Sequence, residues 1–227
     1  MGEAGIGSVV FDRLIDFYRG AVVAGTRRTQ AERVAETRGL LIDATIQTIV
    51  EAGYARVTVK EVCRRAGVSH GGLFGRFETL ADLVAAAAAE VGRRLMAKFV
   101  ASMEQLPDRG DVSAVLALWR DAARDPLNTV WLELTVAART DSQLRERLQS
   151  VRADYASAML KSGSEMRAVR GLPPERIFVL GSIVGTLFDG DAIHSGPFPQ
   201  PELDAPRLEV LTAMMRHYLE SERSPRE

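Results

Sequence analysis

The sequence predicts an all-α fold with about nine helices. From Thr37 onward, apolar residues recur at positions i, i+3 and i+4, which is the period of an amphipathic helix. Glycine and proline clusters interrupt this pattern at intervals typical of helix ends. No strand-length segment alternates apolar and polar residues, so nothing indicates a β-sheet.

The composition is that of a globular protein and excludes several classes. The 227 residues are 46% hydrophobic and 26% charged, with a net charge of −1. The single cysteine excludes an internal disulfide framework and a cysteine-cluster zinc site. No apolar run approaches the roughly 18 residues of a membrane span. The N-terminus also lacks the pattern of a secretory signal. We therefore expect a cytoplasmic protein with no membrane partner.

The first residues are expected to form a flexible arm. Five glycines punctuate residues 1–25, although 9–23 could form one short helix. The first regular helix is expected from Thr37 to Gly53, where glycine would adopt the left-handed conformation that ends helices. Thr58 to Glu61 has the spacing of a capping box and predicts a second helix of about two turns.

Further capping signals and breakers define the remaining helices. Ser69 predicts a short third helix over 70–75, and Thr79 with Asp82 predicts a fourth that extends to Met103. Five more helices are expected near 112–124, 127–139, 142–167, 175–193 and 204–222. The breakers between them are Asp125-Pro126, Asp141, Pro173-Pro174 and the stretch from Ser195 to Pro206.

Residues 58–77 have the spacing of a helix-turn-helix. Two short helices meet at Gly67-Val68-Ser69, where the glycine ends the first helix with a positive φ and Val68 is expected to be buried. Cys63 supplies a small side chain where the two helices approach each other. An ordinary helical hairpin would show the same pattern. The surrounding segment 27–77, however, is basic, with nine Arg or Lys against five Asp or Glu.

The stretch from Thr37 to Leu83 resembles the DNA-binding domain of the tetracycline-repressor (TetR) family. The residues that carry the resemblance are Thr37-Arg38, Ile42-Asp43-Ala44, Gly53-Tyr54, Thr58-Val59, Ala66-Gly67-Val68-Ser69, Gly71, Leu73-Phe74, Phe77 and Leu83. The resemblance implies a homodimeric bacterial repressor that binds double-stranded operator DNA. It also implies a ligand-binding core in the C-terminal helices and a dimer bundle in the last two.

We accordingly expect three parts. Residues 1–34 would be the flexible arm, 35–95 the DNA-binding domain, and 96–227 the effector-binding and dimerisation domain. The arginines at 27, 28 and 33 would either contact the minor groove of DNA or lie in solvent.

The resemblance places ten residues at the DNA: Arg38, Thr58, Val59, Lys60, Ser69, His70, Gly71, Gly72, Phe74 and Arg76. Thr58 and Arg76 suit phosphate contacts, and the two glycines would lie against base edges. The chain departs from the family at Phe74, where a tyrosine whose hydroxyl reaches phosphate is usual. Leu80 likewise replaces a common lysine, so both phosphate contacts are lost.

The sequence contains no recognisable catalytic motif, and we expect no catalytic residue, cofactor or metal. There is no HExxH, GxSxG, P-loop or GxGxxG pattern. Asp189 and Asp191 with His194 form the one cluster of metal-ligand type. We expect it to be a solvated helix end, because the two aspartates point in different directions on a helix.

An effector pocket is expected in the C-terminal helices, lined by Met96, Phe99, Met103, Trp119, Trp131 and Glu133. Methionine and tryptophan side chains suit a small apolar or aromatic molecule. Glu133 is a charge within an otherwise apolar run, so it needs a partner or a ligand if it is buried. Plain core packing is the alternative.

The last two helices are expected to pair with those of a second copy through Phe178, Gly181, Ser182, Gly185, Leu211, Met215 and Tyr218. Gly181 and Gly185 would permit close approach of a partner helix, or they would fit against their own domain. The sequence thus favours a ligand-responsive repressor. A regulator without an effector, an activator, and an all-α enzyme or structural helical protein are the alternatives.

Overall fold

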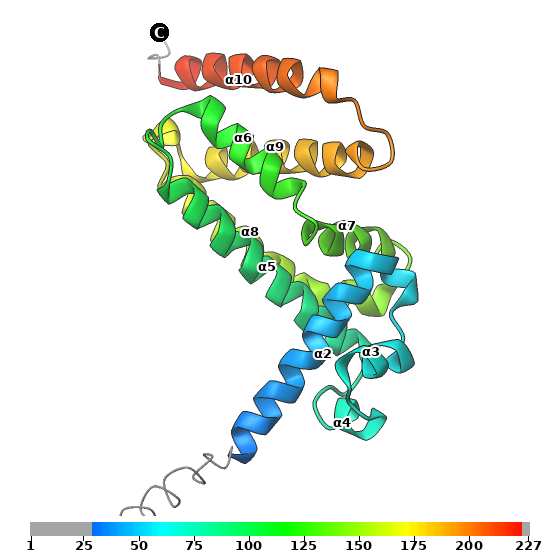
Figure 1. Ribbon diagram of the computed structural model, residues 1–227. Helices are drawn as coiled ribbons and strands as arrows, with labels where there is room; N and C mark the ends of the chain where they lie inside the picture. The colour runs from blue at the N-terminus through cyan, green and yellow to red at the C-terminus, as the bar shows by residue number, and fades with distance from the viewer. Residues whose placement is uncertain (1–28, 224–227) are drawn as a thin grey trace, which may run out of the picture.

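The computed structural model describes residues 29–223, which form nine α-helices, two short 3-10 helices and no strand (Figure 1). The α-helices are α2 (Gln30–Ala52), α3 (Val59–Ala66), α4 (His70–Phe74), α5 (Leu80–Glu104), α6 (Val112–Ala123), α7 (Asn128–Ala137), α8 (Ser142–Ser164), α9 (Pro174–Ser195) and α10 (Pro201–Arg223). The 3-10 helices are η1 (Tyr54–Arg56) and η2 (Arg167–Val169). The all-α prediction is confirmed, whereas the expected helix over 9–23 lies outside the described residues, as do Arg27 and Arg28.

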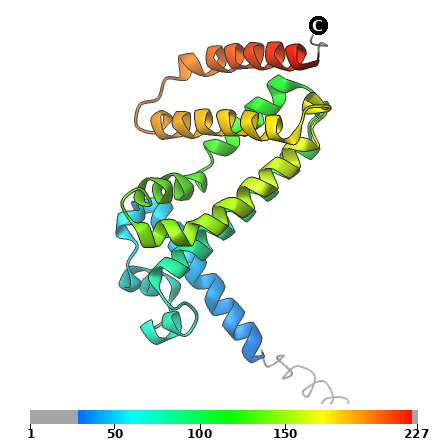
Figure 2. The same cartoon turned by 180° about the vertical axis from the view of Figure 1, so that it is seen from behind.

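Two groups of helices lie at opposite ends of the molecule (Figures 1 and 2). At one end α2, α3 and α4, called the headpiece below, pack around the start of α5. At the other end α6, α9 and α10, called the distal end, pack on one another. The long helices α5 and α8 run side by side between the two ends, so they connect them physically.

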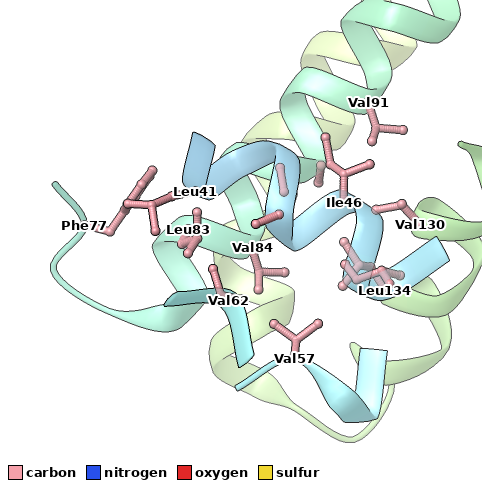
Figure 3. Close-up of a cluster of buried hydrophobic side chains, with 14 of the residues drawn as sticks. Leu41, Ile46, Val57, Val62, Phe77, Leu83, Val84, Val91, Val130 and Leu134 are labelled. Carbon is pink, nitrogen blue, oxygen red and sulfur yellow. The ribbon is translucent and has the colours of Figure 1, made fainter. Parts of the chain in front are cut away.

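One hydrophobic core joins the headpiece to the helices that follow it (Figure 3). Leu41 of α2, Val62 of α3 and Leu83 of α5 are fully buried in it. Val130 and Leu134 of α7 are also fully buried, and they close the core from the other side of α2. A movement of α2 relative to α7 would therefore expose apolar surface to water and cost free energy.

The first regular helix begins at Gln30 rather than at Thr37, so the expectation of a flexible arm is wrong for residues 30–34. Thr29 and Glu32 form a capping box: the threonine hydroxyl accepts from the Glu32 amide, and the glutamate accepts from the Thr29 amide. The Thr29-x-x-Glu32 spacing was available in the sequence and marks this start.

The two glycines expected to end helices behave differently. Gly67 has φ 65° and ψ 27°, the left-handed conformation that was predicted. Gly53 has φ 82° but ψ 161°, so the prediction of a left-handed cap is wrong there. The Gly53 backbone instead extends into η1, in a region of φ and ψ that is open almost only to glycine.

The distal end departs from the sequence analysis in two ways. α10 starts at Pro201 and contains Pro206, although the sequence predicts a break through Pro206. Pro201 stands at the first helical position, where a proline removes no helical hydrogen bond, whereas Pro206 lies inside the helix and removes the amide bond to the carbonyl four residues earlier. Among residues 29–223, α9 is also long and apolar enough to cross a membrane by length and composition, with 11% of its most apolar window buried. The sequence of α9 does not stand out as an uninterrupted apolar run, because glycine, serine and threonine divide it.

Candidate nucleic-acid interface

Local hydrogen bonds fix where α3 and α4 begin. The Thr58 hydroxyl accepts from the Glu61 amide at 3.1 Å and caps α3. The Ser69 hydroxyl accepts from the Gly72 amide, also at 3.1 Å, and caps α4. Between them the left-handed Gly67 reverses the chain. These contacts join residues at most three apart, which explains why the sequence predicts this motif well.

The capping box expected at Thr58 is only half formed. The Glu61 carboxylate accepts from Arg64 at 2.7 Å and from Arg65 at 2.7 Å instead of reaching back to the Thr58 amide. The hydrogen bonds from Arg64 and then Arg65 lower the pKa of Glu61 from 4.5 to about 2. Arg65 also donates to Glu51 of α2 at 2.6 Å, so it ties α3 to α2.

The interior of the motif is apolar, with one correction. Val62 and Leu73 are fully buried, and Cys63 is buried, with its thiol pKa raised by burial. Val68 is only half-buried rather than buried. Its Cγ1 would lie 2.7 Å from a Cβ on Gly72, so the turn leaves room for Val68 only because α4 has a glycine there.

The ten residues predicted to face DNA all lie in or beside the headpiece, at the end opposite α9 and α10 (Figure 1). Seven are exposed: Arg38, Thr58, Lys60, Ser69, His70, Gly71 and Phe74. Val59, Gly72 and Arg76 are half-buried. The Arg38 guanidinium lies over the Phe77 ring, 4.4 Å from its centroid, which holds this charge at the headpiece surface.

Arg76 is the most constrained of these cations. Its Nη1 donates to the Gly75 carbonyl oxygen at 3.1 Å. Its Nε is buried and has no hydrogen-bond partner among residues 29–223. A guanidinium held close to the backbone in this way has fixed geometry, which suits contact with a phosphate oxygen.

The six residues predicted to line an effector pocket are divided among three places. Phe99 and Met103 are buried in a small cluster with Val115 and Met166, and the Trp119 ring meets Phe99 edge to face at 6.4 Å. These side chains pack on one another, as the alternative of plain core packing predicts for them. Met96 is half-buried on α5.

Trp131 and Glu133 have different neighbours from those expected. The Trp131 ring stacks on Tyr155 of α8 at 5.7 Å, and its indole Nε1 is buried with no hydrogen-bond partner in the described part of the chain. The Glu133 carboxylate accepts from the backbone amide of Tyr54 at 3.1 Å. It therefore anchors η1, which follows α2, to α7, so this charge has a partner within the fold.

Sequence reasoning missed a polar group beside Trp131. Asn128 is buried and donates to the Ala123 carbonyl oxygen at 2.9 Å and to Asp189 of α9 at 3.2 Å. Burial raises the pKa of Asp189, and burial together with Asp189 raises that of Tyr155. The Asp189 side chain is nevertheless exposed, although one of its carboxylate oxygens accepts from Asn128. No local pattern signals the contact, because it joins residues 61 apart.

The acidic cluster near the end of α9 has an arginine partner. The Asp191 carboxylate accepts a hydrogen bond at 2.8 Å from Arg124, the C-cap residue of α6. Residues 29–223 contain no group of three acidic, histidine or cysteine side chains that could hold a metal ion.

A pocket of about 300 Å³ lies between α6, η2 and α10, lined by Gly110, Val112, Arg167, Ala168, Arg216, Leu219 and Glu220. None of the six predicted effector residues lines it.

The residues predicted for the dimer interface lie on two faces. A Cβ on Gly181 or Gly185 would lie 3.6 or 3.7 Å from the Trp119 ring of the same chain, so these glycines pack inward. Leu211 and Met215 also pack inward, against a cluster that includes Val184. For Gly181 and Gly185, this packing favours the alternative that they fit against their own domain. Phe178 and Ser182 are exposed, and Tyr218 is half-buried.

Known proteins resemble the chain in sequence and in fold. A family model described as bacterial regulatory proteins of the tetR family matches residues 41–87. An uncharacterized HTH-type transcriptional regulator of Mycobacterium tuberculosis is 41% identical over 189 residues, covering 83% of this chain and 97% of the relative. A TetR-family regulator structure from Rhodococcus sp. has a TM-score of 0.62 at 20% identity, over 84% of this chain and 100% of that chain. The structure of the multidrug binding protein EbrR complexed with imidazole has a TM-score of 0.62 at 22% identity, over 84% and 95%.

Proposed function

The chain belongs to the TetR family of bacterial transcriptional regulators, and we propose that it is a ligand-responsive repressor that binds palindromic operator DNA as a homodimer. The family and the fold are those of regulators with a DNA-binding helix-turn-helix rather than of enzymes. A bacterial repressor must reach the chromosome, so the proposal places it in the cytoplasm.

The observation that carries the proposal is the geometry of the α3–α4 motif. Both helices are capped by their own hydroxyl side chains, and the outer face of α4 carries exposed His70 and Phe74. Arg38 and Lys60 lie exposed on the neighbouring helices. A short rigid helix with cations on either side suits the major groove, because base edges are read there while phosphates fix the orientation.

Dimerisation through the distal end is supported by its exposed apolar surface. Val179, Ile183 and Leu187 of α9 are spaced four apart and are 47%, 57% and 47% exposed. Val210 and Met214 of α10 are 61% and 65% exposed. A stripe of this kind on adjacent helices suits a four-helix bundle with a second copy. This interface uses the outer faces of α9 and α10, not the glycine face predicted from the sequence.

Response to an effector is supported by the environment of Trp131. An indole N–H buried without a partner is costly, and a ligand with a hydrogen-bond acceptor would relieve that cost. The stacked Trp131 and Tyr155 rings offer an aromatic surface for a small apolar or aromatic molecule. The EbrR structure, which holds imidazole, shares this fold. A regulator without an effector is the second candidate, because Phe99, Met103 and Trp119 fill their part of the core.

The bonds between α7, α8 and the headpiece give an effector signal a route to the DNA. The Glu133 carboxylate holds the Tyr54 amide, and Arg147 of α8 donates to Asp82 at 2.7 Å, next to the cap of α5. A ligand that shifts α7 or α8 would displace these contacts. To move a population from 1:99 to 99:1, the ligand must favour one state by about 5.5 kcal/mol.

Gel-shift titration of the complete chain with duplex DNA flanking its own gene tests the proposal. Arg76→Ala is expected to weaken binding to all sequences and to reduce the slope of log affinity against log salt by about one per site. His70→Ala is expected to change which bases are preferred. The roles are wrong if Arg76→Ala alters base preference and leaves the salt slope unchanged. A chain that prefers no duplex sequence contradicts the DNA-binding proposal itself.

The effector part has its own test. Tryptophan fluorescence of the wild-type chain is expected to change on titration with small aromatic compounds, and Trp131→Phe is expected to abolish that change while DNA affinity is kept. Compounds that alter fluorescence without lowering affinity for DNA would favour the regulator without an effector.

A further inference from the structure

The outer face of α4 carries an exposed aromatic ring next to a glycine. α4 has five residues, and Leu73 is its one fully buried side chain. Phe74 is 51% exposed and Gly71 is exposed. Because Gly71 and Phe74 are three residues apart in a helix, they share a face.

The three glycines at positions 71, 72 and 75 differ in whether packing within the chain requires them. A Cβ on Gly72 would lie 2.7 Å from Val68, and a Cβ on Gly75 would lie 3.1 Å from the Gly71 carbonyl oxygen. A Cβ on Gly71 would meet nothing within 4 Å, and its φ is not positive. Glycine destabilises a helix relative to alanine, so the fold alone does not account for Gly71. Its absent side chain leaves space for a surface outside this chain.

Burial in the described fold also does not account for Phe74. Its ring is half exposed and does not belong to the residues packed against the headpiece core. A phenyl ring makes no hydrogen bond, so a polar base edge covered by it would lose water without compensation. In the major groove the thymine C5-methyl is the apolar group, and the other edge groups are hydrogen-bond donors or acceptors.

We propose that Phe74 reads the C5-methyl group of one thymine in each half-site, and that Gly71 lets α4 come close enough to the base edges for this contact. The proposal rests on the proposed DNA-binding function and adds a specificity-determining residue to it. The ring supplies sequence preference by apolar contact, while exposed His70 on the same short helix supplies the polar contact.

Removal of single methyl groups from the DNA tests the contact without any change to the protein. The wild-type chain would first select its preferred duplexes from a random library. Each thymine of a selected duplex would then be replaced in turn by deoxyuridine, which lacks only the C5-methyl group. Affinity by fluorescence anisotropy is expected to fall about fourfold at one position of a half-site, and about fifteenfold when both half-sites are changed.

The variant Phe74→Ala completes the cycle. It is expected to bind the thymine duplex about as weakly as the wild type binds the deoxyuridine duplex, with no further loss on the deoxyuridine duplex. The proposal is overturned if the wild type is indifferent to every thymine methyl group. It is also overturned if Phe74→Ala keeps the full thymine preference. Failure of the wild type to select any sequence would instead contradict the proposed function.

Gly71→Ala tests the close approach. It is expected to weaken binding to the selected duplex by about tenfold, because a methyl group would be forced into a packed interface. Its unfolding temperature is expected to stay the same or rise. Gly196→Ala is the matched control, since Gly196 has equally open surroundings, a φ of −66° and a place at the C-cap of α9. Wild-type affinity in Gly71→Ala would overturn the role given to this glycine.

Discussion

The α3–α4 motif and the distal end are built by different kinds of contact. In the motif, Thr58 and Ser69 each accept an amide three residues ahead, and Gly67 ends α3 by its own backbone conformation. At the distal end, Arg124, the C-cap residue of α6, donates to Asp204 of α10 at 2.7 Å, and Trp119 of α6 covers Gly181 of α9. These pairs are far apart in sequence.

This difference separates what each region contributes. Local caps give the motif a fixed shape that does not depend on the identity of the distal side chains. Long-range packing instead decides which face of α9 and α10 is left outside, and that choice determines which residues a second copy can contact. Variants that remove a cap and variants that disturb packing should therefore differ in the size of their effect and in the property that they change.

The largest effect is expected from the packing of the distal end. Phe188 of α9 is 3% exposed within the cluster that joins α6, α9 and α10. Phe188→Ala is expected to lower the free energy of unfolding by about 3–5 kcal/mol, because it removes apolar contacts and leaves a cavity. Urea unfolding measures this change. Phe198→Ala is the control, since Phe198 is 70% exposed; an equal loss in the control would contradict the packing account.

A second variant tests which way the glycine face of α9 points. Gly185→Leu is expected to lower the free energy of unfolding by about 1–3 kcal/mol, because the new side chain must displace Trp119. Gly190→Leu is the matched control, with nothing within 4 Å of its Cβ position. If Gly185→Leu keeps wild-type stability but becomes monomeric in light scattering, the glycine face belongs to the dimer interface after all.

The difference between the two regions also explains which features of the fold could be predicted from the sequence. Ser69, Gly67, Thr79 and the helices that they start or end were predicted correctly, because a cap involves residues within one turn. The direction in which Gly185 points was not predicted correctly. Two nearly opposite faces of α9 could each form an interface, and only the packing of Trp119 against one of them shows which face lies inside. Apolar pattern alone predicts that a helix is amphipathic, and not which neighbour it meets.

The same reason applies to the candidate sites. The residues predicted to face DNA could be located because they belong to a local motif. The partner of Glu133 could not be predicted, because the Tyr54 amide is 79 residues away. A charge in an apolar run indicates that some partner exists, and the structure supplies one in the backbone of η1.

A smaller effect is expected from a single cap of the motif. Ser69→Ala removes the acceptor of the Gly72 amide and is expected to lower the free energy of unfolding by about 1 kcal/mol. It should also weaken DNA binding, because α4 loses its fixed start. Ser150→Ala, an exposed position in the middle of α8, serves as the control in both measurements. A cap variant with unchanged stability and DNA affinity would show that packing, not the cap, sets the start of α4.

The smallest effect is expected from the acid dependence of the local ion pairs in α3. Arg64 and Arg65 lower the pKa of Glu61 to about 2 in the folded chain, against 4.5 for the free group. The contribution of Glu61 to stability is therefore present above about pH 4.5 and is lost as the pH falls toward 2. Glu61→Gln is expected to show a shallower fall in unfolding temperature over this pH range. A fall as steep as that of the wild type would contradict the assignment.

The most direct test of the two-ended account is sedimentation velocity of a fluorescently labelled selected duplex with the complete chain. The wild type is expected to form a complex of two chains per duplex. Ile183→Glu is expected to sediment as a monomer and to leave the duplex free at concentrations that saturate it with wild type, because Ile183 lies on the outer apolar stripe of α9. Val136→Glu, equally exposed at 57% but on α7, should behave as wild type. An Ile183→Glu chain that stays dimeric and saturates the duplex like wild type would contradict the account.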